Sequence, residues 1–220
     1  PGAVTDATAD IAMTLLLMSA RRAGEGERLL RAGHWSGWQP TQFLGRHVSG
    51  KSLGIIGMGR IGRAVARRAH FGFGMAVRFF NRSALPDPGL PATQVGTLHD
   101  AMAADFVVVA VPGGAGTRHL VNAAALAAMQ PHGHLINIAR GDVVDEAALI
   151  EALEAGRIGG AGLDVYEFEP QVPARLIALQ NVTLLPHLGT AAEEVRDAMG
   201  MMVVANLAAL AAGQPLPNRV

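Results

Sequence analysis

From residue 52 onward the chain alternates short apolar runs with stretches that have helical spacing. The runs typical of strands span residues 52–57, 75–80, 94–95, 105–110, 134–138, 159–164 and 182–185. The stretches that favour helices span residues 60–71, 98–103, 122–129 and 145–155. Strands that are apolar almost throughout are typical of a parallel sheet covered by helices on both faces. We therefore expect an α/β fold with a doubly wound parallel sheet, in which ligands bind beyond the carboxyl ends of the strands.

Helical patterns flank this alternation on both sides. Residues 6–32 favour a helix in which Gly24 and Gly26 are expected to cause a bend or break. The apolar stripe of this helix consists of Ile11, Leu15, Met18, Leu29 and Leu30. Residues 33–50 are rich in glycine and are expected to form a connecting loop, and residues 191–212 favour a last helix.

The composition argues against several classes of protein. Half of the residues are hydrophobic, and 18 basic residues balance 18 acidic ones. A disordered tail is therefore excluded, and no net charge attracts nucleic acid or an acidic membrane. The longest apolar runs, residues 11–20 and 198–212, are shorter than the roughly 20 residues of a membrane span. We expect neither nucleic acid nor a membrane among the partners.

Cysteine is absent from the sequence, which rules out disulfides and thiolate metal sites and suits a reducing compartment. His132 and His134 have no third ligand beside them, so we expect no metal site. The chain starts with no signal-like segment, and its natural N-terminus is not expected to be Pro1. These features together predict a cytoplasmic protein.

The sequence Gly57-Met58-Gly59-Arg60-Ile61-Gly62 lies between the first strand and the first helix of the alternation. In that context a Gly-x-Gly-x-x-Gly sequence strongly indicates dinucleotide binding, although alone it is a weak signal. Gly57 permits a tight turn, Gly59 lets the backbone approach a pyrophosphate, and Gly62 lets helix and strand pack closely. At Arg60 and Ile61 the helix begins, and its free N–H groups face the phosphates. A turn that serves packing alone is the alternative.

The end of the second strand indicates which dinucleotide is bound. NAD sites place an acidic residue there to bind the ribose hydroxyls. This chain instead has Asn81-Arg82-Ser83, so no carboxylate repels a 2′-phosphate, and Arg82 and Ser83 could bind one. We therefore expect NADP in preference to NAD. An ordinary surface role for Arg82 is the alternative.

Three other strand ends carry polar residues that packing does not require: Arg140, Glu169 and His187. Arg140 could bind a substrate carboxylate with its planar guanidinium. His187 could exchange the proton on the substrate oxygen, and Glu169 could orient the imidazole and stabilise its protonated form. Each residue alone has an ordinary explanation, such as an ion pair between Arg140 and Asp142. Their shared position at one sheet edge favours hydride transfer to a carbonyl.

The chain resembles the D-isomer-specific 2-hydroxyacid dehydrogenases, especially the glyoxylate/hydroxypyruvate reductase branch. The resemblance spans essentially the whole chain and rests on Gly50-Lys51-Ser52-Leu53-Gly54-Ile55-Ile56-Gly57, Thr117-Arg118-His119-Leu120-Val121-Asn122, Ile136-Asn137-Ile138-Ala139-Arg140-Gly141, Asp164-Val165-Tyr166-Glu167-Phe168-Glu169-Pro170 and Pro186-His187-Leu188-Gly189. It implies that Arg140, Glu169 and His187 are the catalytic residues and that Asp164 contacts the nicotinamide amide. The remaining cofactor-binding residues that it implies are Val111, Pro112, Thr117, Ile138, Ala139 and Gly189.

The resemblance also carries expectations about the whole protein. It implies a Rossmann-type dinucleotide-binding domain at residues 1–186 and a C-terminal segment, residues 187–220, that returns toward a substrate domain. Most of that substrate domain would precede Pro1. We expect a homodimer through the helix at residues 6–32, and a small 2-oxo or 2-hydroxy acid as the substrate of an NAD(P)-dependent dehydrogenase. The alternative is a dinucleotide-sensing binding protein similar to the corepressors of this fold.

Overall fold

The computed structural model describes residues 2–218, so that Pro1 and the end of the predicted C-terminal segment lie outside it. Within these residues seven parallel strands form one sheet in the order β3-β2-β1-β4-β5-β6-β7. The strands are β1 (Ser52–Ile56), β2 (Ala76–Phe80), β3 (Ala92–Gln94), β4 (Phe106–Val109), β5 (His134–Asn137), β6 (Gly160–Leu163) and β7 (Val182–Leu184). The predicted doubly wound sheet is confirmed. Successive strands are added on one side of β1 up to β3 and on its other side from β4 onward. Such sheets bind ligands at this point, between β1 and β4.

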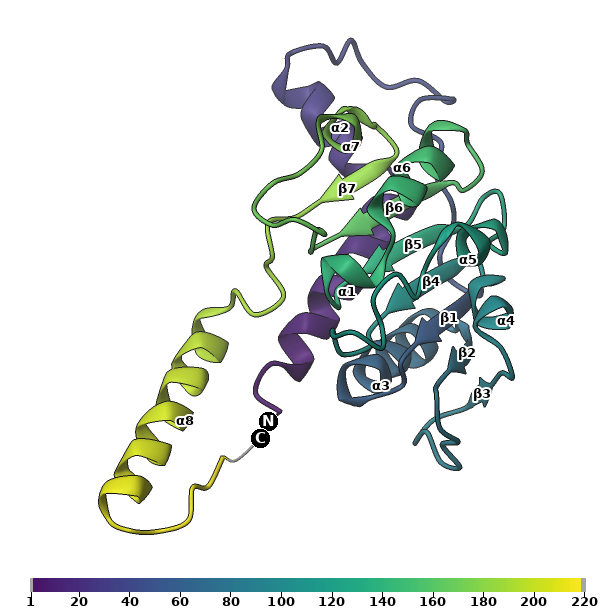
Figure 1. The fold of residues 1–220 in the computed structure, drawn as a ribbon. Coiled ribbons are helices and arrows are strands. Elements are labelled where there is room, and N and C mark those ends of the chain that lie inside the picture. The colour runs from purple at the N-terminus through teal and green to yellow at the C-terminus, as the bar shows by residue number, and fades with distance from the viewer. Residues whose placement is uncertain (1, 219–220) are drawn as a thin grey trace.

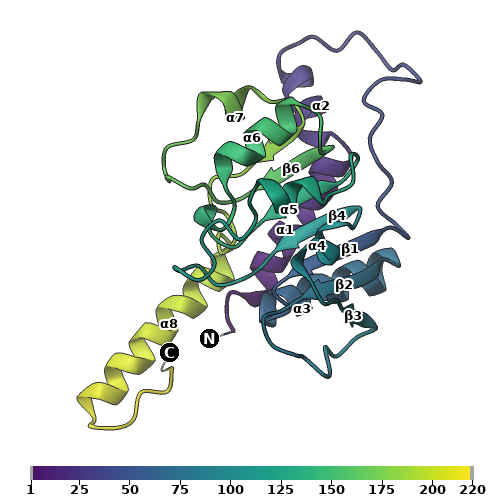
Figure 2. The ribbon, with the colours of Figure 1, turned by 45° about the vertical axis from the view of Figure 1, so that its right-hand side comes forward.

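The helices of the described residues are α1 (Thr5–Ala20), α2 (Ala23–Arg31), α3 (Arg60–Arg67), α4 (Leu98–Met102), α5 (Ala123–Ala127), α6 (Glu146–Glu154), α7 (Ala174–Ala178) and α8 (Glu193–Ala211). Helices cover both faces of the sheet, whereas α8 extends away from it (Figures 1 and 2). A π-helical turn, Arg68–Gly72, continues α3, and a 3₁₀ turn lies at Gly141–Val143.

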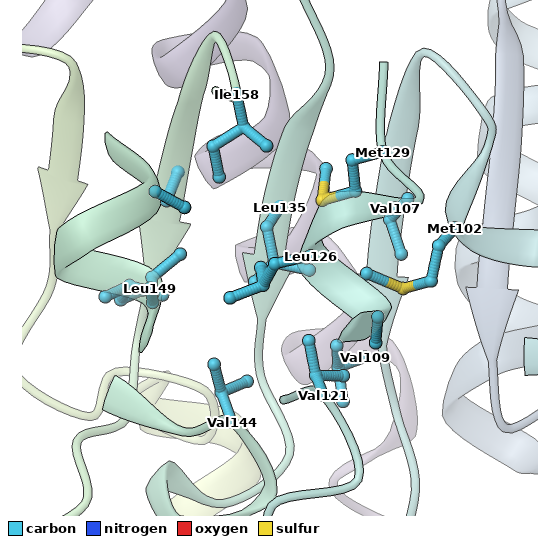
Figure 3. Close-up of a cluster of buried hydrophobic side chains, with 14 of the residues drawn as sticks. Met102, Val107, Val109, Val121, Leu126, Met129, Leu135, Val144, Leu149 and Ile158 are labelled. Carbon is cyan, nitrogen blue, oxygen red and sulfur yellow. The ribbon is translucent and has the colours of Figure 1, made fainter. Parts of the chain in front are cut away.

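Alternate residues of the central strands point into two separate cores. In β1, Leu53 and Ile55 pack toward α1 and α3, whereas Ile56 packs toward the layer formed by α4, α5 and α6. Figure 3 shows part of the second core, where Leu126 of α5 meets Leu135 of β5. Because both faces of the sheet are covered, its strands are apolar on both sides, which is the pattern that the sequence presents.

The N-terminal helix breaks at a different place from the one predicted. The interruption lies at Arg22, whose φ of +53° is left-handed, and Gly24 and Gly26 lie within α2. Helix α7 and the 3₁₀ turn were not predicted. Both are shorter than two helical turns, so they carry too little periodicity to be seen in the sequence.

The first part of the N-terminal helix packs against its own chain. Helix α1 buries Leu15 and Leu16 against the sheet and α3, whereas α2 has no buried residue and leaves Leu30 exposed. Helix α1 is therefore part of the core of its own chain. No helix among residues 2–218 is long and apolar enough to cross a membrane.

Candidate active site

A cleft of about 760 Å³ lies at the carboxyl ends of β1, β4 and β5, on both sides of the point where the strand order reverses. Predicted cofactor-binding or catalytic residues make up most of its wall: Gly59, Arg60, Ile61, Val111, Pro112, Ile138, Ala139 and Arg140. Ala110, Gly113, Gly114 and Asp142 complete it. Three strand ends that are distant in sequence thus contribute to one cleft, as predicted for a doubly wound sheet.

The glycine-rich turn leaves room for a ligand at the place where the sequence predicts one. Gly57 has a φ of +99°, and a Cβ there would lie 2.9 Å from the Ala110 carbonyl carbon. A Cβ on Gly59, by contrast, would meet nothing within 4 Å. Gly59 also begins α3 without a side-chain cap, so the first N–H groups of the helix are free to bind an anion. The turn therefore fits the pyrophosphate of a dinucleotide.

Of the three residues after β2, one supports the glycine-rich turn and the other two are exposed. The Asn81 Oδ1 atom accepts a hydrogen bond of 2.7 Å from the Met58 N–H and so fixes the glycine-rich turn. Arg82 and Ser83 are exposed. Among residues 2–218 the Arg82 guanidinium makes no ion pair and no hydrogen bond to the protein, which leaves its charge available to a ligand.

Arg140 lies on a turn that two neighbouring residues hold in shape. The buried Asn137 side chain accepts from the Ala139 N–H at 3.1 Å and donates to the Arg140 carbonyl at 3.1 Å. A Cβ on Gly141 would lie 1.8 Å from the Tyr166 carbonyl carbon, so only glycine lets these two segments touch. The exposed Arg140 guanidinium donates to the Ala139 carbonyl at 2.6 Å, and its other N–H groups are free for an anion. The alternative ion pair with Asp142 is not formed.

His187 and Glu169 form a hydrogen-bonded pair. The Glu169 Oε2 atom lies 2.9 Å from Nδ1 of His187, and its Oε1 atom accepts from the Tyr166 N–H at 2.9 Å. Because a carboxylate only accepts, Nδ1 carries the proton and Nε2 is the ring atom free for a substrate. The side chain of His187 is half exposed, and that of Glu169 is one-third exposed. The prediction that Glu169 orients the imidazole matches this geometry.

Asp164 is buried beneath the turn that carries His187. Its carboxylate accepts from the Leu188 N–H at 2.6 Å and from the Gly189 N–H at 2.8 Å. Burial raises the pKa of Asp164, and these two hydrogen bonds oppose that effect only in part. Asp164 and Gly189 therefore do not line the cleft but meet each other behind the His187 turn.

The loop after β4 is closed by its own hydrogen bonds and tied to the segment after β6. The Thr117 hydroxyl donates to the Pro112 carbonyl at 2.7 Å. Glu167 accepts from Nε2 of His119 at 2.8 Å and from Arg118 at 3.1 Å. Burial alone would raise the pKa of Glu167, but these hydrogen bonds outweigh it and lower the pKa. The sequence motifs contain His119 and Glu167, but nothing in the sequence pairs them.

The geometry of the site defines the class of protein by itself. A sheet of this topology holds a glycine-rich turn at its switch point, and an arginine and a histidine–glutamate pair follow strands that end at the same edge. An anion can be bound and a proton moved beside a dinucleotide, which is what an NAD(P)-dependent oxidoreductase requires.

Comparisons with known proteins agree. The profile of the D-isomer specific 2-hydroxyacid dehydrogenase NAD binding domain matches residues 13–189. The chain is 45% identical to the glyoxylate reductase of Thermococcus litoralis, over 100% of the chain and 68% of that protein. It is 44% identical to a glyoxylate/hydroxypyruvate reductase of Arabidopsis thaliana, over 98% of the chain and 68% of that protein. The chain belongs to the D-isomer specific 2-hydroxyacid dehydrogenase family.

A solved structure supports the same assignment. The NADPH-dependent glyoxylate/hydroxypyruvate reductase of Sinorhizobium meliloti, in complex with NADP and malonate, superimposes with a TM-score of 0.92 at 42% identity. The match covers 100% of this chain and 68% of that one. The predicted Rossmann-type domain and nicotinamide dinucleotide cofactor are confirmed.

Proposed function

We propose that this protein reduces glyoxylate, hydroxypyruvate or a similarly small 2-oxo acid to the 2-hydroxy acid. The observation that carries the proposal is the 2.9 Å hydrogen bond between His187 and Glu169, at the edge of the sheet that also holds the cleft. The reductase names of the relatives favour an enzyme over a dinucleotide-sensing binding protein. A sensor would need the cofactor site but not a hydrogen-bonded proton donor.

In this proposal each catalytic side chain has one role. Arg140 binds the substrate carboxylate through its free N–H groups, because guanidinium and carboxylate form paired hydrogen bonds. His187, protonated, donates from Nε2 to the carbonyl oxygen, while Glu169 stabilises its positive charge from Nδ1. A bound nicotinamide supplies the hydride. Asn137 and Gly141 keep the Arg140 turn next to the Tyr166–Glu169 segment.

The proposal is tested by following NADPH oxidation with glyoxylate at 340 nm. His187→Ala should reduce kcat by about 10²–10⁴-fold, because a general acid contributes that much to proton transfer. His99→Ala, which changes an exposed histidine of α4, is the control and should leave kcat unchanged. Tight NADPH binding without turnover in the unaltered protein would favour the sensor and refute the proposal.

We further propose that NADP is preferred over NAD. The exposed Arg82 and the hydroxyl of Ser83 support this, since residues 81–83 include no carboxylate that would repel a 2′-phosphate. Arg82→Ala should weaken NADPH binding by about 10- to 100-fold, the range of one charge-assisted contact, and leave NADH binding nearly unchanged. Calorimetric titration of both cofactors measures this. Equal losses for the two cofactors would contradict the assignment.

We propose a homodimer formed by α2 and the loop after it. This segment exposes the large apolar side chains of Leu30, Trp35, Trp38 and Leu44. Several exposed apolar side chains in one segment are typical of a surface that contacts a partner. Sedimentation should show a dimer that the double change Trp35→Ser and Trp38→Ser weakens. A monomeric unaltered protein would refute this proposal.

The domain division and the cellular location also remain proposals. We propose that residues 1–186 form the dinucleotide-binding domain and that residues 187–220 belong to a second unit. Helix α8 supports this, because it extends away from the sheet and buries none of its residues (Figure 1). Limited proteolysis should cut first near the start of α8. A cytoplasmic location is tested by cell fractionation.

A further inference from the structure

The turn that carries His187 adopts a backbone shape that it cannot hold by itself. His187 has a φ of +57°, in the left-handed region that residues other than glycine rarely adopt. Such a residue persists only where its surroundings fix it. The turn leads directly into α8, which buries no residue and therefore provides no packing on that side. Hydrogen bonds to the end of β6 and to α1 hold the turn instead.

Asp164, at the end of β6, holds the three N–H groups of the turn. Its backbone carbonyl accepts from the His187 N–H at 2.9 Å, and its carboxylate accepts from the Leu188 and Gly189 N–H groups. These contacts satisfy the N–H groups of the turn. The carbonyl of Gly189 still needs a donor, because Gly189 is buried and water does not reach it freely.

That donor comes from α1, at the other end of the chain. The Thr8 hydroxyl donates to the Gly189 carbonyl at 3.1 Å, although the two residues are 181 positions apart. Thr8 is 6% exposed. A Cβ on Gly189 would lie 3.2 Å from the Asp164 carboxylate and 3.5 Å from the Thr8 hydroxyl, so the residue is held between the two side chains.

Resting on the proposed function, we propose that Thr8 is a positioning residue for the reaction: its hydroxyl fixes the Gly189 carbonyl and thereby keeps the His187 imidazole against Glu169. Thr8 does not line the cleft, and its hydroxyl bonds to Gly189 and not to His187 or Glu169. It acts through two peptide units of the turn. Without the hydroxyl, the buried carbonyl loses its donor and the turn can shift, which moves the proton donor away from the substrate oxygen.

The test compares Thr8→Val, which keeps the size of the side chain but removes the hydroxyl, with Thr8→Ser, which keeps the hydroxyl. Thr8→Val should lower kcat for glyoxylate by about 10- to 100-fold, because a misplacement of about 1 Å can cost that much. NADPH affinity should change less than about twofold, and Thr8→Ser should restore most of the rate. Thr14→Val is the matched control, since the exposed Thr14 hydroxyl bonds only to the Asp10 carbonyl of its own helix.

A double-mutant cycle separates positioning from a general loss of stability. If Thr8 acts through the imidazole–carboxylate pair, its effect on kcat should largely disappear in a Glu169→Ala background, where no side-chain oxygen is left to accept from Nδ1. Multiplicative effects of the two changes would overturn the inference, as would normal turnover in Thr8→Val. If Thr8→Val does not fold, Thr8→Ala is measured against Thr8→Ser in the same way. An unaltered protein that turns over no 2-oxo acid would instead refute the proposed function.

Discussion

His134 should make this protein less stable in mild acid. It is the first residue of β5 and only 6% exposed. Its Nδ1 atom lies 2.7 Å from the Ser19 hydroxyl, and its ring stacks on Phe106 at 5.6 Å. Burial, with smaller contributions from the charges of Arg46 and His132, lowers the pKa of His134 from 6.5 to about 4. In the unfolded chain the same imidazole regains its ordinary pKa.

The sign of the effect follows from which state binds the proton more readily. Between pH 6.5 and 4 the unfolded chain is protonated at His134 and the folded chain is not, so the free energy of unfolding falls as the pH falls. At pH 5.0 the loss relative to pH 7.5 is about 2 kcal/mol, and it approaches about 3 kcal/mol near pH 4. This is a large part of the 5–15 kcal/mol typical of a folded domain.

Asp105 changes the stability of the protein only at lower pH. Burial alone would raise its pKa, but hydrogen bonds from Ser52 and His132 lower it to about 2. The stability that it contributes is therefore present above pH 3.8 and is lost between pH 3.8 and 2. Measurements at pH 5.0 and above leave this carboxylate ionised in both states.

Urea unfolding of the protein and of His134→Gln at pH 7.5 and pH 5.0 tests the prediction. Glutamine can keep a hydrogen bond to Ser19 but does not titrate, so the pH dependence should shrink by about 2 kcal/mol even if the variant is less stable overall. His34→Gln, in an exposed loop, is the control and should keep the full dependence. The reasoning is refuted if His134→Gln loses as much stability between the two pH values as the unaltered protein.

Two further predictions concern the active site. Glu169→Gln should lower kcat for glyoxylate reduction, because His187 loses the carboxylate that holds its imidazole in place. An unchanged kcat would show that the pair has no role in the rate. Gly141→Ala should destabilise the protein by about 1–3 kcal/mol and lower kcat, since its Cβ would overlap the Tyr166 backbone. Thermal unfolding beside Gly200→Ala, where a Cβ meets nothing within 4 Å, measures the first effect.

The strands, most helices and the glycine-rich turn could be predicted from the sequence because their signals are local. A buried parallel strand is a short apolar run, and a helix start that binds phosphate needs glycines at fixed spacing. Once the strands are predicted, the positions of their carboxyl ends are known, and these put Arg140, Glu169 and His187 at one edge of the sheet. The short helix α7 and the break at Arg22 escaped the prediction, because a few residues carry no clear period.

Which polar groups meet was decided by the tertiary structure alone. Asn81 stands beside Arg82 and Ser83 in the sequence, and only the structure shows that its side chain fixes the turn at Met58. Helix α1 showed only an apolar stripe in the sequence, and the structure shows that it covers the sheet of its own chain and sends Thr8 to Gly189. The physical reason is that periodicity records which face of an element is buried, whereas a hydrogen bond depends on distances between elements. Contacts across 181 residues exist only once the sheet has brought the ends of the chain together.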